Sequence, residues 1–265
     1  HGLLENMPAW VFIDWADVDR RGECAALNAI FCGALEGLRK MARFRGDSYN
    51  QGRIGSVLER LRGNFQERFF DPDRGCVADA RVEDEFSPKT SEHANMAAVR
   101  WGLVDDGVVG EIVSRLYVER SVKYTEAQPF FTGVVLQALD RIGRFDLALQ
   151  IIRERWGERM VERGASSTYE EWGINGSWRS GEFKGFLRTL SHAWSAHPAE
   201  FLTRNLMGLE ILEPGCGKIR LEPKQTEFDY RTVFATPQGG IEVRCENGEI
   251  TFDAPEGVSV EGLES

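Results

Sequence analysis

The sequence predicts a mainly α-helical chain that ends in a small antiparallel β module. Up to Gly208, apolar residues recur at three- and four-residue steps, the period of amphipathic helices. Short links such as DDG and GRFD separate these stretches and are typical of antiparallel helix hairpins. After Gly208, apolar and polar residues alternate, as in strands. We therefore expect part of a toroid in which helix pairs stack around a central cavity, followed by the β module.

Two long helices are expected first. The stretch 23–44 begins the helical pattern, and 47–70 continues it with Asp47 or Ser48 as the N-terminal cap. The turn sequence DPDRG then ends the second helix. The apolar residues of the first helix form one stripe: Leu27, Ile30, Phe31, Ala34, Leu35, Leu38 and Met41.

Five further helices complete the helical part. In the last of them, Pro198 predicts a break or kink near His197. Together with the first two they make seven, an incomplete set for a toroid of six helix pairs. The five are expected over 91–103, 107–118, 128–142, 145–160 and 185–206.

The β module is expected to consist of short antiparallel strands within 218–223 and 228–255. Gly239-Gly240 and Asn247-Gly248 are the turn signals between them. We predict a helical domain over residues 1–208 and a β-sandwich-like module over residues 209–265.

Composition excludes several classes of protein. The 42 acidic and 32 basic residues give a formal charge of −10, which disfavours nucleic acid and anionic membranes as partners. The five cysteines form no CxxC pair, which argues against a zinc ribbon and fits a reducing compartment. No apolar run reaches the roughly 18 residues of a membrane span, and no basic-then-apolar leader is visible at the start. We expect a cytoplasmic chain, which begins without Met as a processed chain or the later part of a longer one would.

Motifs for bound cofactors are also missing from the sequence. It contains no glycine-rich phosphate loop, no GxSxG elbow and no His/Asp cluster at metal-binding spacing. His192 and His197 lie five residues apart, about 140° around a helix, so they do not converge on one metal. We therefore expect no cofactor and no metal site.

Aromatic and acidic residues alternate in the segment 10–23, WVFIDWADVDRRGE. One interpretation is a segment that leads into a helix, in which a tryptophan packs and an aspartate caps. The other is a sugar platform, because an indole face covers the apolar face of a pyranose while carboxylates accept its hydroxyl protons. The residues are Trp10, Phe12 and Trp15 with Asp14, Asp17 and Asp19.

Two adjacent glutamates, Glu170 and Glu171, lie beside Tyr169, Trp172 and Trp178 in a glycine-containing stretch. Like charges and desolvation would both oppose the ionisation of two carboxylates in one apolar pocket. We expect one glutamate to point to solvent and the other to have the properties of a general base for water. The alternative is an exposed loop whose charges aid solubility.

Two histidines outside this stretch are candidates of lesser weight. His192, close to Trp194, could donate to a sugar hydroxyl or orient a carboxylate, or it could be satisfied within helix packing. His93 lies in the first turn of a helix capped by Ser91 or Thr90, where a structural role is expected.

Three segments together resemble the six-hairpin, (α/α)6-barrel α-L-rhamnosidases of glycoside hydrolase family 78. Phe12-Ile13-Asp14-Trp15 resembles a Phe-Gly-Asp-Trp-like segment, with Ile13 in place of glycine. GASSTYEEW (164–172) resembles the loop Gly-Ala-Thr-Thr-x-Trp-Glu-x-Trp, and SHAWSAHPAEFL (191–202) resembles the helix that follows it. The likeness runs from about Trp10 to Cys245, over the C-terminal part of the barrel and the β-domain after it.

The resemblance implies an inverting glycosidase that removes terminal α-L-rhamnosyl residues from glycosides or polysaccharides. It places the general base on Glu170, a sugar-binding tryptophan on Trp15 and a sugar-contacting histidine on His192. Asp14, as the receiver of a ring hydroxyl, and Trp172 are added to the substrate-binding residues. Glu171 falls on a variable position and receives no role.

The resemblance also leaves a gap, because the family's general acid lies upstream of the Phe-Gly-Asp-Trp position. The chain is then either a fragment or a degenerate relative that has lost acid catalysis. Besides a carbohydrate substrate, we expect as partner a missing N-terminal half or a second copy, since an incomplete toroid exposes apolar helix faces. The rival functions are a non-catalytic carbohydrate-binding fragment and a six-hairpin glycosidase or lyase for acidic oligosaccharides, with Asp14 or Glu171 catalytic.

Overall fold

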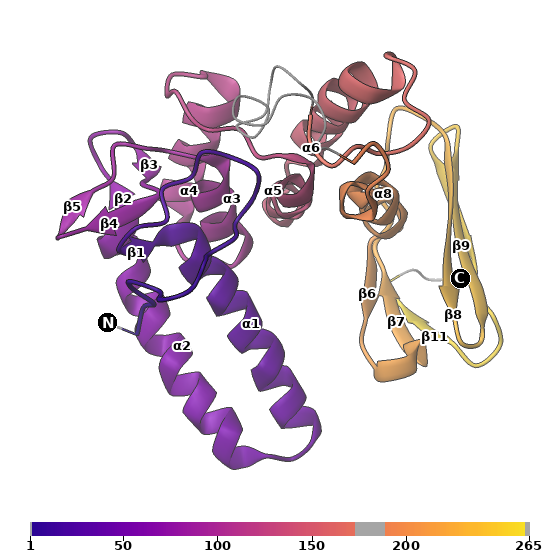
Figure 1. Ribbon diagram of the computed structural model, residues 1–265. Helices are drawn as coiled ribbons and strands as arrows, with labels where there is room; N and C mark the ends of the chain where they lie inside the picture. Colours follow the sequence, from indigo (N-terminus) through magenta and orange to yellow (C-terminus); the bar gives the residue numbers. More distant parts are fainter. Residues whose placement is uncertain (1, 173–188, 263–265) are drawn as a thin grey trace. The chain divides into compact units, whose positions relative to one another are not determined.

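The computed structural model describes residues 2–172 and 189–262. The chain packs as two units, His1–Ser195 and Ala196–Ser265. The first unit contains helical hairpins, and the second contains the α-helix α8 (His197–Leu206) and a set of short strands (Figure 1), which confirms the predicted fold class. The unit boundary lies before helix α8, whereas the predicted domain boundary follows Gly208 and stays a prediction.

The first hairpin is formed by α1 (Ala25–Phe44) and α2 (Ser48–Phe69), which lie side by side in Figure 1. Asp47 caps α2, because its side chain accepts a hydrogen bond from the Asn50 N–H. Both helices agree with the predicted ranges to within two residues at each end. The residues of α2 that are buried against the rest of the unit are Gly55, Leu58, Leu61, Phe65 and Phe69.

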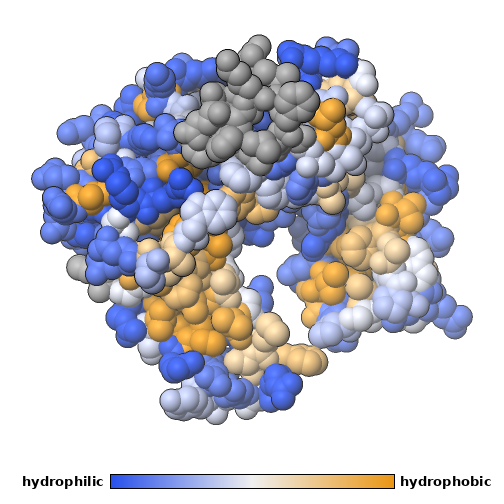
Figure 2. Space-filling model, viewed as in Figure 1, coloured by the Kyte–Doolittle hydropathy of each residue, from blue (hydrophilic) through white to orange (hydrophobic). Residues whose placement is uncertain are grey.

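The buried face of α1 consists mostly of small side chains. Of the predicted apolar stripe only Leu35 is buried, whereas Leu38 and Met41 are 50% and 63% exposed. Phe44, which follows the stripe at the end of α1, is 76% exposed. Figure 2 shows apolar side chains gathered on the surface over α1. Small residues let the neighbouring helices approach, and a Cβ on Gly33 would lie 2.2 Å from the indole nitrogen of Trp101. The buried residues of α1 are Ala25, Ala26, Asn28, Ala29, Cys32, Leu35 and Ala42.

Two further hairpins follow. Ser91 caps the first of their helices, since its hydroxyl oxygen accepts from the Ala94 N–H. Two of the α-helices continue without interruption into π-helical turns, labelled η1 and η2. The elements are α3 (Glu92–Arg100), α4 (Asp106–Val113) with η1 (Ser114–Val118), α5 (Pro129–Arg141), and α6 (Phe145–Ile152) with η2 (Arg153–Val161).

Five short strands in the first unit are absent from the sequence-based prediction. Each has two or three residues, which is too short for an alternating pattern to be recognised. They pair in the order β1-β4-β5 and β2-β3. The strand β1 precedes α1, and the other four lie between α2 and α3. The strands are β1 (Glu23–Cys24), β2 (Phe70–Asp71), β3 (Cys76–Val77), β4 (Ala80–Val82) and β5 (Glu85–Phe86).

The predicted helix over 185–206 is wrong for its first described part. A short 3-10 turn, η3 (Ala193–Ser195), precedes α8, and the extended chain before it bonds to the loop that carries the two glutamates. The break falls where Pro198 predicts it, because proline is accommodated in the first turn of α8. Residues 185–188, also part of this prediction, lie outside the described residues, as does Trp178.

The second unit holds two three-stranded sheets, with the orders β10-β9-β8 and β11-β7-β6. The Asn247-Gly248 turn is confirmed, with φ of 51° and 80°. The other turn lies two residues earlier than predicted, at Pro237-Gln238, because Thr236 pairs with Gly239 across the hairpin. The strand β11 pairs in parallel with β7, in contrast to the antiparallel prediction. The strands are β6 (Leu209–Ile211), β7 (Lys218–Leu221), β8 (Tyr230–Thr236), β9 (Gly239–Glu246), β10 (Glu249–Asp253) and β11 (Ser259–Glu261).

The β unit has a core of its own, and the chain's thiols are distributed over both units. Ile219, Leu221, Ile241 and Val243 are fully buried at the centre of the β core. All five cysteines of the chain are buried and free. Among the described helices, none is long and apolar enough to cross a membrane.

Candidate active site

Both glutamates of the predicted site are buried. Glu170 is 7% exposed and Glu171 is 2% exposed, so the expectation that one of them points to solvent is wrong. The reason lies in the backbone, because residues 168–170 pair with residues 189–192 and draw the loop inward: the Glu170 N–H donates to the Thr189 carbonyl at 2.9 Å. This backbone pairing covers the side chains of Glu170 and Glu171.

Among the described residues, two N–H groups donate to the carboxylate of Glu170. Its Oε1 accepts from the indole Nε1 of Trp15 at 2.8 Å, and its Oε2 accepts from the backbone N–H of Thr189 at 2.9 Å. The indole of Trp194 donates to the Glu170 carbonyl oxygen at 3.1 Å. An ionised carboxylate is an acceptor only, and these donors fix the orientation of such a group.

The indole that donates to this carboxylate belongs to a cluster of aromatic rings. Phe12 lies edge-on to Trp15, with ring centroids 5.1 Å apart, and is stacked with Trp194 at 5.9 Å. The imidazole of His192 is stacked on Trp194 at 4.2 Å, and Phe130 packs against the same indole at 5.1 Å. The structure therefore brings the predicted Trp15 and His192 to one aromatic cluster, in which Phe12 and Trp194 connect them.

The Nδ1 atom of His192 is buried and has no hydrogen-bond partner within the described part of the chain. A buried polar atom without a partner costs about 1–3 kcal/mol. The rest of the residue is fixed, since its backbone exchanges bonds with Thr168.

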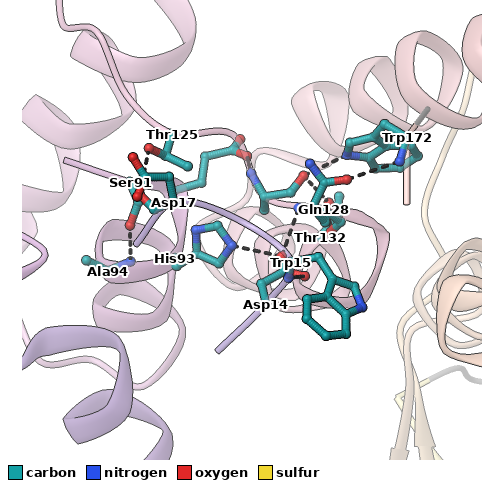
Figure 3. A network of polar contacts seen from close by, with 12 residues as sticks. Asp14, Trp15, Asp17, Ser91, His93, Ala94, Thr125, Gln128, Thr132 and Trp172 are labelled. Atoms are coloured by element: carbon teal, nitrogen blue, oxygen red, sulfur yellow. Dashed lines mark hydrogen bonds and ion pairs between the residues drawn. The ribbon is translucent and has the colours of Figure 1, made fainter. Parts of the chain in front are cut away.

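Asp14 occupies a different place from the one that the resemblance implies. Its side chain is 0% exposed. Its Oδ2 accepts from His93 Nε2 and from the Gln128 N–H, both at 2.8 Å, and its Oδ1 accepts from the Trp15 N–H at 2.8 Å (Figure 3). The carboxylate lies beneath the backbone of Trp15, where it can anchor the loop but does not reach the surface.

Trp172 is buried as well and supports the loop from its C-terminal side. Its indole N–H donates to the Ala127 carbonyl at 2.8 Å, and its backbone N–H donates to the side-chain oxygen of Gln128 at 3.0 Å (Figure 3). Its ring meets Trp156 edge-on at 4.8 Å, and the guanidinium of Arg159 lies 5.4 Å from the ring centre. These contacts leave its ring no exposed face for a sugar.

A buried ion pair lies under the same loop. Arg155, in the π-helical turns η2, donates to the two carboxylate oxygens of Glu92 at 2.7 and 3.0 Å. The hydroxyl of Tyr117 donates to one oxygen at 2.7 Å, and the Ala127 N–H to the other at 2.7 Å. Burial opposes the ionisation of Glu92, but the guanidinium outweighs it and lowers the pKa of Glu92 below 4.5. π-Helical turns are frequent near functional sites.

The remaining aspartates of the first segment have protein partners too. Asp19 is buried, and the Arg21 guanidinium bonded to it lowers its pKa to about 2. Asp17 forms an exposed ion pair with Lys89 at 2.5 Å. Within residues 2–172 and 189–262, no group of three or more His, Cys, Asp or Glu side chains could hold a metal ion.

The candidate site is thus a carboxylate bonded to an indole N–H, next to an aromatic cluster and on a frame of helical hairpins. The profile of the bacterial alpha-L-rhamnosidase 6 hairpin glycosidase domain matches residues 2–206. The chain belongs to this family of glycoside hydrolases.

Solved structures show the same fold. A glycoside hydrolase family 78 rhamnosidase from Bacillus sp. GL1 is 23% identical with a TM-score of 0.84, and the match covers 98% of this chain and 28% of that one. An α-L-rhamnosidase from Streptomyces avermitilis, complexed with L-rhamnose, is 20% identical with a TM-score of 0.70, over 98% and 25% of the two chains. The chain thus spans little more than a quarter of the length of these enzymes. No curated protein matches the sequence.

Proposed function

We propose that this chain forms the base-bearing part of an inverting α-L-rhamnosidase active site, with Glu170 as the general base. The observation that carries the proposal is the grip on the Glu170 carboxylate, between the Trp15 indole and the Thr189 N–H. A base that activates water must be held in one orientation, and pre-organisation of this kind is what positioning contributes to catalysis. The family membership and the rhamnose-bound neighbour support the substrate class.

In this mechanism, Glu170 takes a proton from a water molecule while the water oxygen attacks the anomeric carbon. The bond to the departing glycosidic oxygen breaks on the opposite face, and a carboxylic acid protonates that oxygen. The two carboxyl groups of inverting enzymes lie roughly 6.5–9.5 Å apart. In the present proposal the acid comes from helical hairpins of the domain that lie outside this chain.

The sugar is proposed to lie against the aromatic cluster. Trp15 and Trp194 offer indole rings for the apolar face of the pyranose, and the half-buried imidazole of His192 lies against Trp194 in the same cluster. Asp14 and Trp172 are assigned a supporting role in this proposal, since both are buried among protein partners. This changes their part in the site from contact with the sugar to support of the residues that contact it.

The proposal can be tested on the chain as it stands with 2,4-dinitrophenyl α-L-rhamnoside, because that leaving group departs without protonation. Hydrolysis then needs the base and not the acid. We expect Glu170→Gln to lower kcat by about 10²–10⁴-fold, the usual contribution of a general base. Glu171→Gln is the matched control, since Glu171 is the buried neighbour without an assigned role. Equal losses in both variants would contradict the assignment.

The second function that an observation favours is sugar binding without catalysis, because the aromatic cluster would serve a binding site equally well. In that case the chain retains affinity for L-rhamnose, measured by calorimetry, but does not hydrolyse the activated rhamnoside above the rate of Glu170→Gln. A lyase or glycosidase with Asp14 as the catalytic group draws no support from the geometry, since the Asp14 side chain is fully buried.

We also propose a partner for the exposed stripe of α1. The family is named for six hairpins, and α1–α2, α3–α4 and α5–α6 are three of them. Further hairpins of the same domain would cover Leu38, Met41 and Phe44, which are 50–76% exposed. Alone, the chain is then expected to self-associate, and Leu38→Glu with Met41→Glu should return it to a monomer in light scattering. A monomeric unmodified chain at high concentration would contradict this.

A further inference from the structure

A short series of contacts connects helix α3 to the carboxylate of Glu170. The first link is His93 Nε2 to Asp14 Oδ2 at 2.8 Å, and the second is the Trp15 N–H to Asp14 Oδ1 at 2.8 Å. The third is the indole of Trp15 to Glu170 Oε1 at 2.8 Å. Figure 3 shows the first two links, with the imidazole pointing at the carboxylate of Asp14.

The side chains of His93 and Asp14 are each held in place by their surroundings. The imidazole of His93 is 0% exposed and packs against the ring of Phe131 at 4.7 Å, in the first turn of a capped helix. Asp14 Oδ2 accepts a second bond from the Gln128 N–H, at the start of α5. A carboxylate oxygen carries no proton and can only accept, so the Nε2 of His93 is the donor in their contact.

The loop that carries Trp15 depends on these side-chain bonds. Residues 10–15 belong to no helix or strand, so no backbone ladder fixes them. The Asp14 carboxylate ties the loop to α3 through His93 and to α5 through Gln128. Without the imidazole, a buried carboxylate would lose one of its donors, which costs more than an exposed bond does.

We propose that His93 is a positioning residue for the base: through Asp14 it sets the place of Trp15, whose indole orients the carboxylate of Glu170. The inference rests on the proposed role of Glu170 in catalysis. The position of Trp15, however, can be measured without any reaction. A displacement of about 1 Å in such a group can reduce a rate about 10²-fold.

The test uses the full chain labelled with 15N at the tryptophan indoles. Exchange of each indole N–H with solvent reports how well that group is held. Trp15 donates to Glu170, and Trp156, which donates to the Ser195 carbonyl at 2.8 Å, is an internal control on the same unit. We expect His93→Asn to speed exchange at Trp15 about tenfold, the effect of losing one net hydrogen bond, and to leave Trp156 unchanged.

His93→Gln is the matched rescue variant. Its longer amide reaches the place of Nε2 and can donate to Asp14, whereas the amide of Asn is too short. Protection of Trp15 should therefore return in His93→Gln, and hydrolysis of the activated rhamnoside should fall in His93→Asn and recover in His93→Gln. Both variants keep a polar side chain of similar size, so general loss of the fold would lower protection at Trp156 as well.

The outcomes separate this inference from the proposed function. Unchanged exchange at Trp15 in folded His93→Asn would overturn the positioning role, whatever the rate. Faster exchange at Trp15 with an unchanged rate would likewise overturn the link to the base, and would leave Glu170 to be judged by Glu170→Gln alone. Faster exchange, a lower rate and rescue of both by glutamine would support it.

Discussion

Two regions of the helical unit differ sharply in how their side chains are satisfied. Beneath the Glu170 loop, charged and polar groups such as Asp14, His93 and the Glu92–Arg155 pair are buried and bonded to one another. Along the distal half of α1, large apolar residues such as Leu38 and Phe44 are exposed. The residues that hold the proposed base, Glu170, thus belong to this chain. The apolar stripe of α1, in contrast, has no cover among the described residues. Mutations in the buried polar network and in the apolar stripe should therefore have different effects on stability.

The largest expected loss of stability comes from the polar region. Arg155→Met would leave Glu92 as an unpaired buried carboxylate, and breaking a buried pair costs about 3–5 kcal/mol. The matched control is Arg144→Met, which breaks an exposed pair with Asp146 and should cost about 1 kcal/mol or less. Urea denaturation followed by circular dichroism gives both values. Similar losses in the two variants would mean that the buried network is no more important to the fold than the surface.

A matched pair of leucines on α1 tests the apolar side of the comparison. Leu35 is 7% exposed and Leu38 is 50% exposed, on the same helix. Leu35→Ala should cost about 2–5 kcal/mol of unfolding free energy, and Leu38→Ala about 0.5 kcal/mol or less. The measurement is the same denaturation, at a concentration low enough for the chain to be monomeric. A large loss in Leu38→Ala would show that the stripe is already covered.

The smallest expected effect is the pH dependence of the buried pair. Because the folded-state pKa of Glu92 is lowered below 4.5, the unfolded chain binds this proton more readily. The contribution is complete above about pH 4.5 and is lost as the pH falls through the folded-state pKa. The difference in unfolding free energy between the chain and Glu92→Gln should therefore shrink from about pH 6 to about pH 3. A difference that stays constant over this range would contradict the charged state of Glu92.

Apolar periodicity and helix caps predicted most helices of this fold. They did not predict contacts between residues that are distant in the sequence. The period of apolar residues and the caps at Asp47 and Ser91 found the helices of the three hairpins. The same period did not tell which face of α1 is buried, because that depends on Gly33 and the small residues that admit neighbouring helices. Strands β1–β5 are too short to carry a period.

The candidate site shows the same limit more strongly. The motif around Glu170 singled out the residue, but its indole donor lies 155 residues earlier in the chain. Asp14 is buried against His93, which lies 79 residues away. The sequence indicated only that His93 is in the first turn of a helix. Trp194 lies two residues after the predicted His192, so the sequence could have included it in the site. No sequence pattern indicated that Gln128 would bond to Asp14 and Trp172.

The most direct test of the central claim is azide rescue of Glu170→Ala. Azide is an anionic nucleophile that needs no base, so it can attack the activated rhamnoside from the face where Glu170 would activate water. We predict that azide restores turnover in Glu170→Ala, with β-L-rhamnosyl azide identified by proton NMR, and does not do so in Glu171→Ala. A variant without rescue, or an azide product that retains the α configuration, would contradict the assignment of Glu170 as the base of an inverting reaction.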